Sequence, residues 1–243
     1  MYIDKRIIFI IIIIMVATTA FNLLTQPGQL LSLLLTIPGV LIAITFHEFA
    51  HAFAADRLGD DTPRMQGRLS LNPLAHLDPI GSLMLLFAGF GWGKPVQINP
   101  RNFNRKFSMT AGEAIVAVAG PVMNFLLAIL LTVIYCTIYK FAGSFMLTQV
   151  GMIIVTIIQL AIVINIGLGV FNLIPIPPLD GSKVLKNFLP YNARTWFEDR
   201  AYIFYIVFVV LWAVGILGLI ITPVTNVISN FLINIIGRLF GLY

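Results

Sequence analysis

The stretch Ile42–Asp56, IAITFHEFAHAFAAD, carries two histidines and one glutamate within an otherwise apolar run. In a helix, His47 and His51 are one turn apart and project from the same face. Two imidazoles at this spacing can bind one metal ion, and Glu48 beside them can act as a general base on a water molecule at that metal. The pattern His-Glu-x-x-His is therefore typical of zinc-dependent hydrolases.

Glu48 lies where a membrane helix is expected, and a charged side chain at the bilayer centre costs roughly 2.5–3.5 kcal/mol on insertion scales. A glutamate at that depth is seldom present without a function. The chain has three histidines and three glutamates, so chance placement of the pattern is a poor explanation. The alternative is that His47 and His51 merely form hydrogen bonds within a helix bundle.

A catalytic zinc site needs three protein ligands and one open position, so a third ligand must come from elsewhere in the chain. Asp180 is the best candidate, because it follows a helix that prolines break, and its carboxylate can turn into a cavity. The alternative for Asp180 is a turn-forming role in the sequence Leu-Asp-Gly. The other candidates for the third ligand are His76 and Asp78 in the NPLAHLDP loop and Glu113 at the start of a helix. For each of them the main alternative is a structural or capping role.

The composition indicates a polytopic helical membrane protein. The 243 residues are 59% hydrophobic and 10% charged, with a mean hydropathy of +0.96, whereas soluble domains carry about 25% charged residues. We expect one membrane domain over residues 1–243 with its core at 30–186. The single cysteine, Cys136, excludes an internal disulfide and a cysteine-based metal site.

Apolar runs predict an all-α fold with about six transmembrane helices. Pro223 is expected to separate the last two. Lys5 and Arg6 precede the first run, which could be a signal peptide, although its length favours a retained helix. Ile80–Phe90 is too short to span and is expected to form a re-entrant or interfacial element between helices two and three. The expected helices are 7–24, 30–55, 111–139, 149–173, 201–221 and 224–239.

The basic residues predict the topology. With an even number of crossings, 14 of the 15 lysines and arginines lie on the N-terminal side, and Lys140 alone lies opposite. The positive-inside rule then makes that side the cytoplasm, with the HEFAH and PPLDG segments toward the same leaflet. The net charge of +5 therefore follows membrane topology and needs no nucleic-acid partner.

Five motifs in order, HEFAH, NPLAHLDPIG, GWGKPV, AGPVMN and NLIPIPPLDG, resemble those of the site-2 protease family of intramembrane zinc metalloproteases. The likeness covers residues 30–186 approximately and is specific as a set. It implies that His47, His51 and Asp180 bind one zinc ion and that Glu48 is the catalytic base.

The same resemblance implies roles for three further residues. Asn172 and Pro175 would position the substrate or polarise the scissile carbonyl, and Asn124 would lie near the site. The GFGWGKPV segment resembles the family's membrane-associated β-hairpin, which can pair with an extended substrate strand. The chain has the appearance of a minimal form without a PDZ domain.

We expect an endopeptidase that cuts transmembrane protein substrates in or near their membrane segments, in the lipid bilayer of a prokaryotic cell membrane, with its site toward the cytoplasm. Two other classes are weighed against it. A divalent-metal transporter would need polar residues along a path through both leaflets, whereas the outer halves of these helices are nearly featureless. A catalytically inactive membrane adaptor would not need an intact His-Glu-x-x-His with Asp180. The substrate and the oligomeric state do not follow from the sequence.

Overall fold

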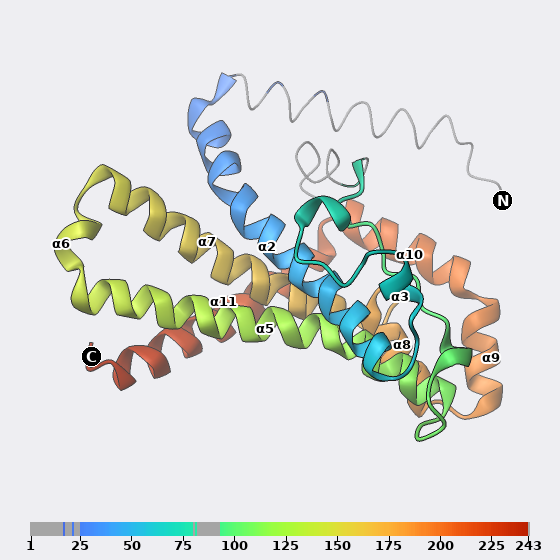
Figure 1. Ribbon diagram of the computed structural model, residues 1–243. Helices are drawn as coiled ribbons and strands as arrows, with labels where there is room; N and C mark the ends of the chain where they lie inside the picture. Colours follow the sequence, from blue (N-terminus) through green and yellow to red (C-terminus); the bar gives the residue numbers. More distant parts are fainter. Residues whose placement is uncertain (1–16, 18–20, 22–24, 80, 82–92, 243) are drawn as a thin grey trace.

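The computed structural model describes residues 17, 21, 25–79, 81 and 93–242. Three long helices form its centre, and each packs against the other two: α2 (Pro27–Arg57), α5 (Met109–Phe141) and α7 (Gln149–Asn172). Figure 1 shows α5 and α7 running in opposite directions between the polar end on the right and the short α6 (Gly143–Met146) on the left. α2 and α7 therefore both end at the polar end of the molecule.

Local sequence explains where α5 and α7 begin and how closely the helices pack. The hydroxyl of Ser108 accepts a hydrogen bond from the Ala111 N–H at 3.2 Å, which satisfies a free donor at the start of α5. Thr148 caps α7 in the same way. Gly39 lets α2 approach α7, because a Cβ there would lie 2.9 Å from the Cα of Ala161. The contact at Gly39 therefore sets the spacing between α2 and α7.

The other helices lie at the two ends of this core or against one side of it. The polar connection between α2 and α5 contains α3 (Thr62–Met65) and two 3₁₀ turns, Pro73–Ala75 and Pro100–Asn102. After α7 come α8 (Asp180–Phe188), α9 (Tyr191–Asp199), α10 (Ala201–Ala213) and α11 (Ile216–Leu239). α8 packs on α5, and α11 packs on α7 and α5.

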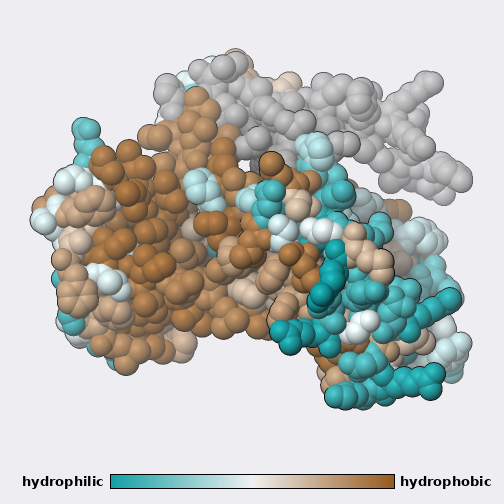
Figure 2. Space-filling model, viewed as in Figure 1, coloured by the Kyte–Doolittle hydropathy of each residue, from teal (hydrophilic) through white to brown (hydrophobic). Residues whose placement is uncertain are grey.

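The exposed surface matches a lipid environment. In the part of the chain that the structure describes, four helices are long and apolar enough to cross a membrane: Gly28–Arg57, Met109–Phe141, Gln149–Asn172 and Ile216–Leu239. Figure 2 shows a continuous hydrophobic surface over the left part of the molecule and polar residues gathered at the right. Large apolar side chains such as Leu126 and Leu130 are each 53% exposed. An apolar surface of this extent is unfavourable in water, so the prediction of an all-α integral membrane protein is confirmed.

The break between the last two helices differs from the prediction. It lies at Val214–Gly215 and not at Pro223, which is inside α11. Gly215 has a φ of +80°, a left-handed conformation that glycine adopts without steric cost and that ends α10. Pro223 cannot donate a helical hydrogen bond, but α11 continues through it.

The position of Arg238 also differs from the prediction. The Lys140 amine donates a hydrogen bond of 2.7 Å to the carbonyl of Phe240, so the end of α11 lies at the same end of the molecule as Lys140. α10 has 13 residues, or about 20 Å of helix, which is shorter than the roughly 30 Å hydrocarbon core. Of the described helices after α7, α11 alone is long enough to cross the membrane. Arg238 near its end therefore lies on the same side as Lys140, and the expectation that Lys140 alone lies opposite the other basic residues was wrong.

Two predicted elements lie outside the described residues: the first helix, 7–24, apart from two isolated positions, and the re-entrant element at 80–90, apart from Gly81. Most of the GFGWG part of the expected hairpin also lies outside them. Where the description resumes, Gly93 forms an isolated antiparallel bridge with Leu77. The described residues contain no longer strand pairing.

Candidate active site

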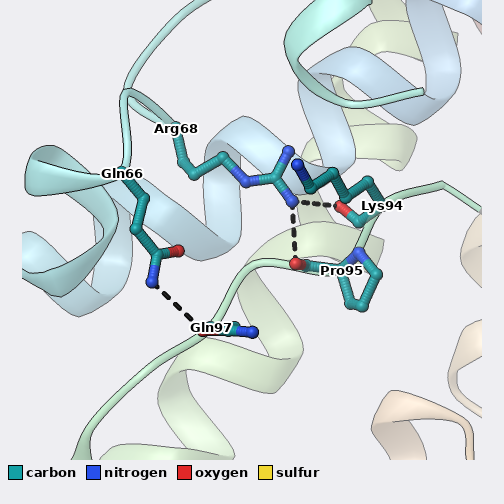
Figure 3. Close-up of a pocket in the computed structure, with 5 residues that line it drawn as sticks. All are labelled: Gln66, Arg68, Lys94, Pro95 and Gln97. Atoms are coloured by element: carbon teal, nitrogen blue, oxygen red, sulfur yellow. Dashed lines mark hydrogen bonds between the residues drawn. The ribbon is translucent and has the colours of Figure 1, made fainter. Parts of the chain in front are cut away.

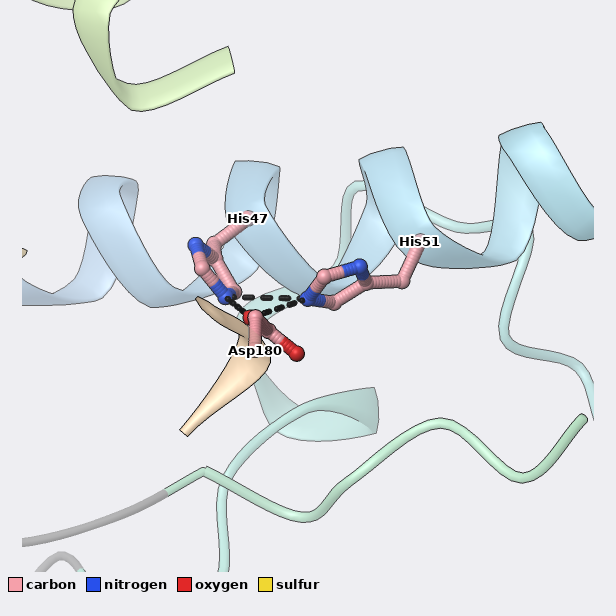
Figure 4. A group of neighbouring side chains, drawn as sticks. All are labelled: His47, His51 and Asp180. Atoms are coloured by element: carbon pink, nitrogen blue, oxygen red, sulfur yellow. Dashed lines mark hydrogen bonds and ion pairs between the residues drawn. The ribbon is translucent and has the colours of Figure 1, made fainter. Parts of the chain in front are cut away.

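Three side chains from two helices meet at one point. Nε2 of His47 lies 3.0 Å from Nε2 of His51, and the two nitrogens lie 3.2 and 3.1 Å from Oδ2 of Asp180. Figure 4 shows both imidazoles directed at this carboxylate. All three residues are buried. The structure therefore brings together the two histidines of one helical turn and an aspartate more than 120 residues away in the chain.

Helix position explains why these groups meet. His47 and His51 face inward from α2 toward α5 and α8, and Asp180 is the first residue of α8. The positive end of a helix dipole favours a carboxylate at that position. Asp180 therefore presents its carboxylate to the two imidazoles.

Hydrogen bonds on the far side of each ring determine which nitrogen carries the proton. Nδ1 of His51 lies 2.7 Å from the carbonyl oxygen of Val116, which can only accept. Nδ1 of His47 lies 2.6 Å from Oδ1 of Asn124. Because Nδ1 must donate in both rings, Nε2 of each neutral ring is left with a lone pair toward Asp180.

The orientation of Asn124 is itself determined by two acceptors. Its amide nitrogen donates to the carbonyl of Ala43 at 3.1 Å and to Oδ1 of Asn165 at 3.0 Å. Asn165 in turn donates to the carbonyl of Ala161 at 2.8 Å. This fully buried chain of bonds leaves only the oxygen of Asn124 to face His47. Asn165 therefore acts on the site through Asn124.

Three electron-pair donors thus converge, two imidazole nitrogens and one carboxylate oxygen, and a cation between them would hold such a group together. Zinc binds nitrogen and oxygen ligands at about 2.0–2.2 Å in a tetrahedron, which places ligand atoms about 3.3 Å apart. The observed separations of 3.0–3.2 Å are close to that spacing. The donor set and its outer hydrogen bonds fit a zinc ion.

Gly120 of α5 leaves room beside these ligand atoms. A Cβ at this position would lie 2.6 Å from Nε2 of His51 and 2.7 Å from Nε2 of His47. Any side chain would therefore collide with the face of the site that the two imidazoles present to α5. The glycine of the AGPVMN motif keeps this face open.

Glu48 lies one residue after His47, and its environment differs from that of the three converging groups. It is half-buried, and its Oε2 accepts a hydrogen bond of 3.0 Å from the N–H of Val96. Gly93 of the same segment also lies close to this carboxylate. The segment that follows the GFGWG sequence therefore covers the candidate general base and orients it.

The other predicted residues bond backbone groups or are exposed. Asn172 ends α7, and its amide donates to the carbonyl of Leu168 at 3.0 Å. Pro175 is exposed. His76 is fully buried and bonds the carbonyl of Ser70, and Asp78 accepts from the N–H of Gly81, so these two have structural contacts.

Sequence reasoning missed Gly120 and Asn165. A signal for Asn165 was present, because it is a polar residue in the middle of the apolar run AIVINIGLG, where a buried amide requires partners. Gly120 gave no such signal, since glycine is common in membrane helices. Only the packing of α5 against α2 reveals what it contributes.

Comparison with known proteins identifies the family. Residues 137–214 match the family model described as Peptidase family M50. The chain is 34% identical over 201 residues to the Bacillus subtilis (strain 168) protein named "Putative zinc metalloprotease YwhC", and the match covers 83% of this chain and 90% of that protein. It is 33% identical over 198 residues to "Putative zinc metalloprotease Rip2" of Mycolicibacterium smegmatis, covering 79% of this chain and 69% of the relative.

A further relative is "Putative zinc metalloprotease Rip2" of Mycobacterium tuberculosis, 34% identical over 156 residues, which are 63% of this chain and 56% of the relative. No solved structure matches the chain. The resemblance that the five motifs indicated is therefore confirmed. The chain belongs to peptidase family M50, the site-2 protease family of metalloproteases.

Proposed function

We propose that this protein is a zinc-dependent endopeptidase that hydrolyses peptide bonds in or near the transmembrane segments of other membrane proteins, with one zinc ion per chain. The proposal rests on one observation: possible metal-ligand atoms of His47, His51 and Asp180 meet beside Glu48. Membership in a metalloprotease family supports the same chemistry.

The depth of the site supports a substrate within the membrane. His51 and His47 lie six and ten residues before Arg57, where α2 ends. At 1.5 Å per residue, these positions are about 9 and 15 Å along the helix from its end. A hydrocarbon core is about 30 Å thick, so a scissile bond at this site would lie below the lipid surface.

In the proposed mechanism, His47, His51 and Asp180 would hold the metal. A zinc ion there would supply Lewis acidity, which would acidify water and polarise a carbonyl. Glu48 takes the proton from the attacking water and passes it to the leaving amine. The N–H of Val96 occupies Oε2 of Glu48 and leaves Oε1 for this proton transfer.

Substrate positioning is assigned to Asn172 and Pro175. One amide hydrogen of Asn172 is used by Leu168, and the second is available to bind a substrate carbonyl. Pro175 and its neighbours interrupt helical structure after α7, so that Asp180 and an extended substrate can approach the site from the same end. Asn124 acts through the imidazole of His47.

We place the site at the cytoplasmic side of a prokaryotic cell membrane. The end that carries the site has seven basic residues between Arg57 and Lys106 and four between Lys183 and Arg200, whereas the described part of the opposite end has Lys140 and Arg238. This asymmetry follows the positive-inside rule. The proposed partners are the bilayer and a membrane-protein substrate, with no nucleic acid.

The test uses the variant Glu48→Gln in purified protein reconstituted into vesicles with a single-span test substrate. We expect cleavage to fall by at least about 10² to 10⁴, the usual contribution of a general base, while bound zinc stays at one per chain. Zinc is measured by elemental analysis and cleavage by gel mobility. As a control, His47→Ala should lose both zinc and cleavage. Unchanged cleavage by the Glu48→Gln variant would exclude Glu48 as the base, and zinc binding without any proteolysis would favour transport or an inactive adaptor.

A further inference from the structure

A hollow of about 310 Å³ opens beside the segment that follows Gly93. Its walls are the side chains of Gln66, Arg68, Lys94, Pro95 and Gln97. Figure 3 shows Arg68 and Lys94 on one side and the two glutamines, which are joined by a hydrogen bond of 3.1 Å, on the other. Every wall except Pro95 therefore offers a polar group.

The described side chains that line this hollow carry two positive charges and no negative charge. Arg68 is 4% exposed, and its guanidinium donates to the carbonyls of Ala75, Lys94 and Pro95. These neutral acceptors use three of its five N–H donors and leave its charge in place. None of the described residues that line the hollow carries a carboxylate, and the ion pairs among the described residues elsewhere in the structure involve neither Arg68 nor Lys94. An anionic group is therefore the favoured occupant.

The hollow is close to the candidate general base. The two carbonyls that Arg68 binds at 2.6 and 2.8 Å belong to Lys94 and Pro95. The next residue, Val96, donates its N–H to Glu48. An extended chain advances about 3.3 Å per residue, so the hollow and the base are separated by roughly the length of two or three residues of peptide.

The size and position of the hollow restrict what can bind. A volume of about 310 Å³ is at the small end of ligand pockets and suits one side chain with its backbone, not a whole helix. An extended substrate with its scissile bond at the metal site would carry neighbouring residues past Lys94. Arg and Lys both bind carboxylates by charge-assisted hydrogen bonds.

We propose that this hollow is a subsite for an aspartate or glutamate side chain of the substrate, a few residues from the scissile bond on the side of the membrane where α2 ends. The preferred substrates are then membrane proteins with an acidic residue at that juxtamembrane position. This inference rests on the proposed function, because it assumes a peptide in the site.

Binding, not cleavage, provides the test. The Glu48→Gln protein is placed in phosphatidylcholine vesicles and titrated with fluorescent single-span peptides that carry either Glu or Gln at successive juxtamembrane positions. We expect the Glu peptide to bind about two- to five-fold more tightly at one or two adjacent positions, as one partly exposed ion pair allows. Adding Lys94→Gln should remove this preference, and Lys94→Glu should transfer it to a peptide with Lys at that position.

Lys106→Gln is the matched control, because it removes one exposed lysine from the same polar connection without touching the hollow. It should keep the preference. A preference that survives Lys94→Gln, or the absence of a preference at every position, would overturn the subsite. So would a result in which Lys94→Gln weakens binding to phosphatidylglycerol vesicles and leaves the peptide preference intact, because the hollow would then bind a lipid phosphate.

The outcome is separable from that of the proposed function. Wild-type cleavage of the single-span substrate tests proteolysis, whereas the Glu48→Gln binding series tests the hollow alone. A charge preference without cleavage would count against the protease and retain the subsite. Cleavage without a charge preference would retain the protease and remove the subsite.

Discussion

At the scale of single residues, the site depends on atoms that do not touch the metal position. The carbonyl of Val116 and the amide of Asn124 hold the protons of His51 and His47 on Nδ1. Without these partners, an imidazole could rotate or adopt the other tautomer and would present an N–H to the metal. Asn165 lies one step farther out and keeps Asn124 in the required orientation.

Asn165→Leu provides a prediction at this scale. Leucine has a similar size but cannot accept from Asn124, so the amide of Asn124 loses one of the two bonds that orient it. We expect zinc affinity, measured by competition with a chelator, to fall by roughly tenfold, the lower end of the effect of outer-shell changes. Thr132→Val is the control, because Thr132 is also fully buried in the helix core but bonds only the carbonyl of Ala128. Equal affinities for Asn165→Leu and wild type would show that Asn165 does not position the ligands.

At the scale of elements, the connection between α2 and α5 holds the extended segment against Glu48. Asp60 is fully buried and joins two parts of this connection. Its carboxylate accepts from the N–H and hydroxyl of Thr62, from the N–H of Asn99 at 2.6 Å and from the amide of Asn102 at 3.0 Å. Arg68 ties the same segment from the other side through its three carbonyl contacts. The active site therefore depends on polar bonds in a loop, whereas its metal ligands depend on helix packing.

This arrangement predicts a pH dependence for the connection. Burial raises the pKa of Asp60, but its hydrogen bonds outweigh burial and bring the pKa below the ordinary value of 3.8. A lowered folded-state pKa means that Asp60 stabilises the connection at neutral pH, and that this contribution is lost as the pH falls below about 4, through the folded-state pKa. We expect the protection factors for amide hydrogen exchange in residues 58–79 and 93–104 to fall in that range, while those in α5 and α7 are unchanged.

Asp60→Asn tests the same contact at neutral pH. Its amide group cannot accept from both Thr62 and Asn99, so one buried donor is left without a partner, at a cost of about 1–3 kcal/mol. Limited proteolysis should then cut the connection faster than in wild type. The exposed neighbour Asp61, changed to Asn, should have no such effect, and equal rates for both variants would contradict the assigned role of Asp60.

At the scale of the whole molecule, one end is polar and carries the site, while the rest is an apolar bundle (Figure 2). The described helices cross an odd number of times between the end of α2 and the end of α11, because α10 is too short to span. Charge counting had predicted Arg238 at the site end, since a single arginine near a helix end carries little weight among 15 basic residues. The contact of Lys140 with Phe240 places it at the other end.

The topology predicts which positions a membrane-impermeant maleimide can label from each side. In a background with Cys136 changed to Ser, Leu239→Cys and Leu147→Cys should react from the same face of sealed vesicles, and Lys106→Cys from the opposite face. All three residues are exposed. Inverted vesicles serve as the control, because there the labelling pattern should reverse. If Leu239→Cys and Lys106→Cys were labelled from the same face, the chain would cross the membrane an even number of times between these two positions.

The sequence by itself determined the class and much of the chemistry of this protein. Apolar run length predicted the membrane helices, because a span needs about 20 residues without charges, and the structure confirms those at 30–55, 111–139 and 149–173 within a few residues. The spacing of His47 and His51 placed them on one helical face, since this depends only on the period of the helix. Both are local properties, and neither requires knowledge of how helices pack.

Tertiary structure decided what depends on contacts between distant segments. It brought Asp180 within 3.2 Å of both imidazoles, joined Asn165 to His47 through Asn124, and put Val96 on Glu48. It also placed the helix break at Gly215 where the sequence had predicted Pro223, and it placed the end of α11 on the side of Lys140. A local pattern cannot specify these features, because they depend on which buried polar groups find partners when helices from different parts of the chain pack together.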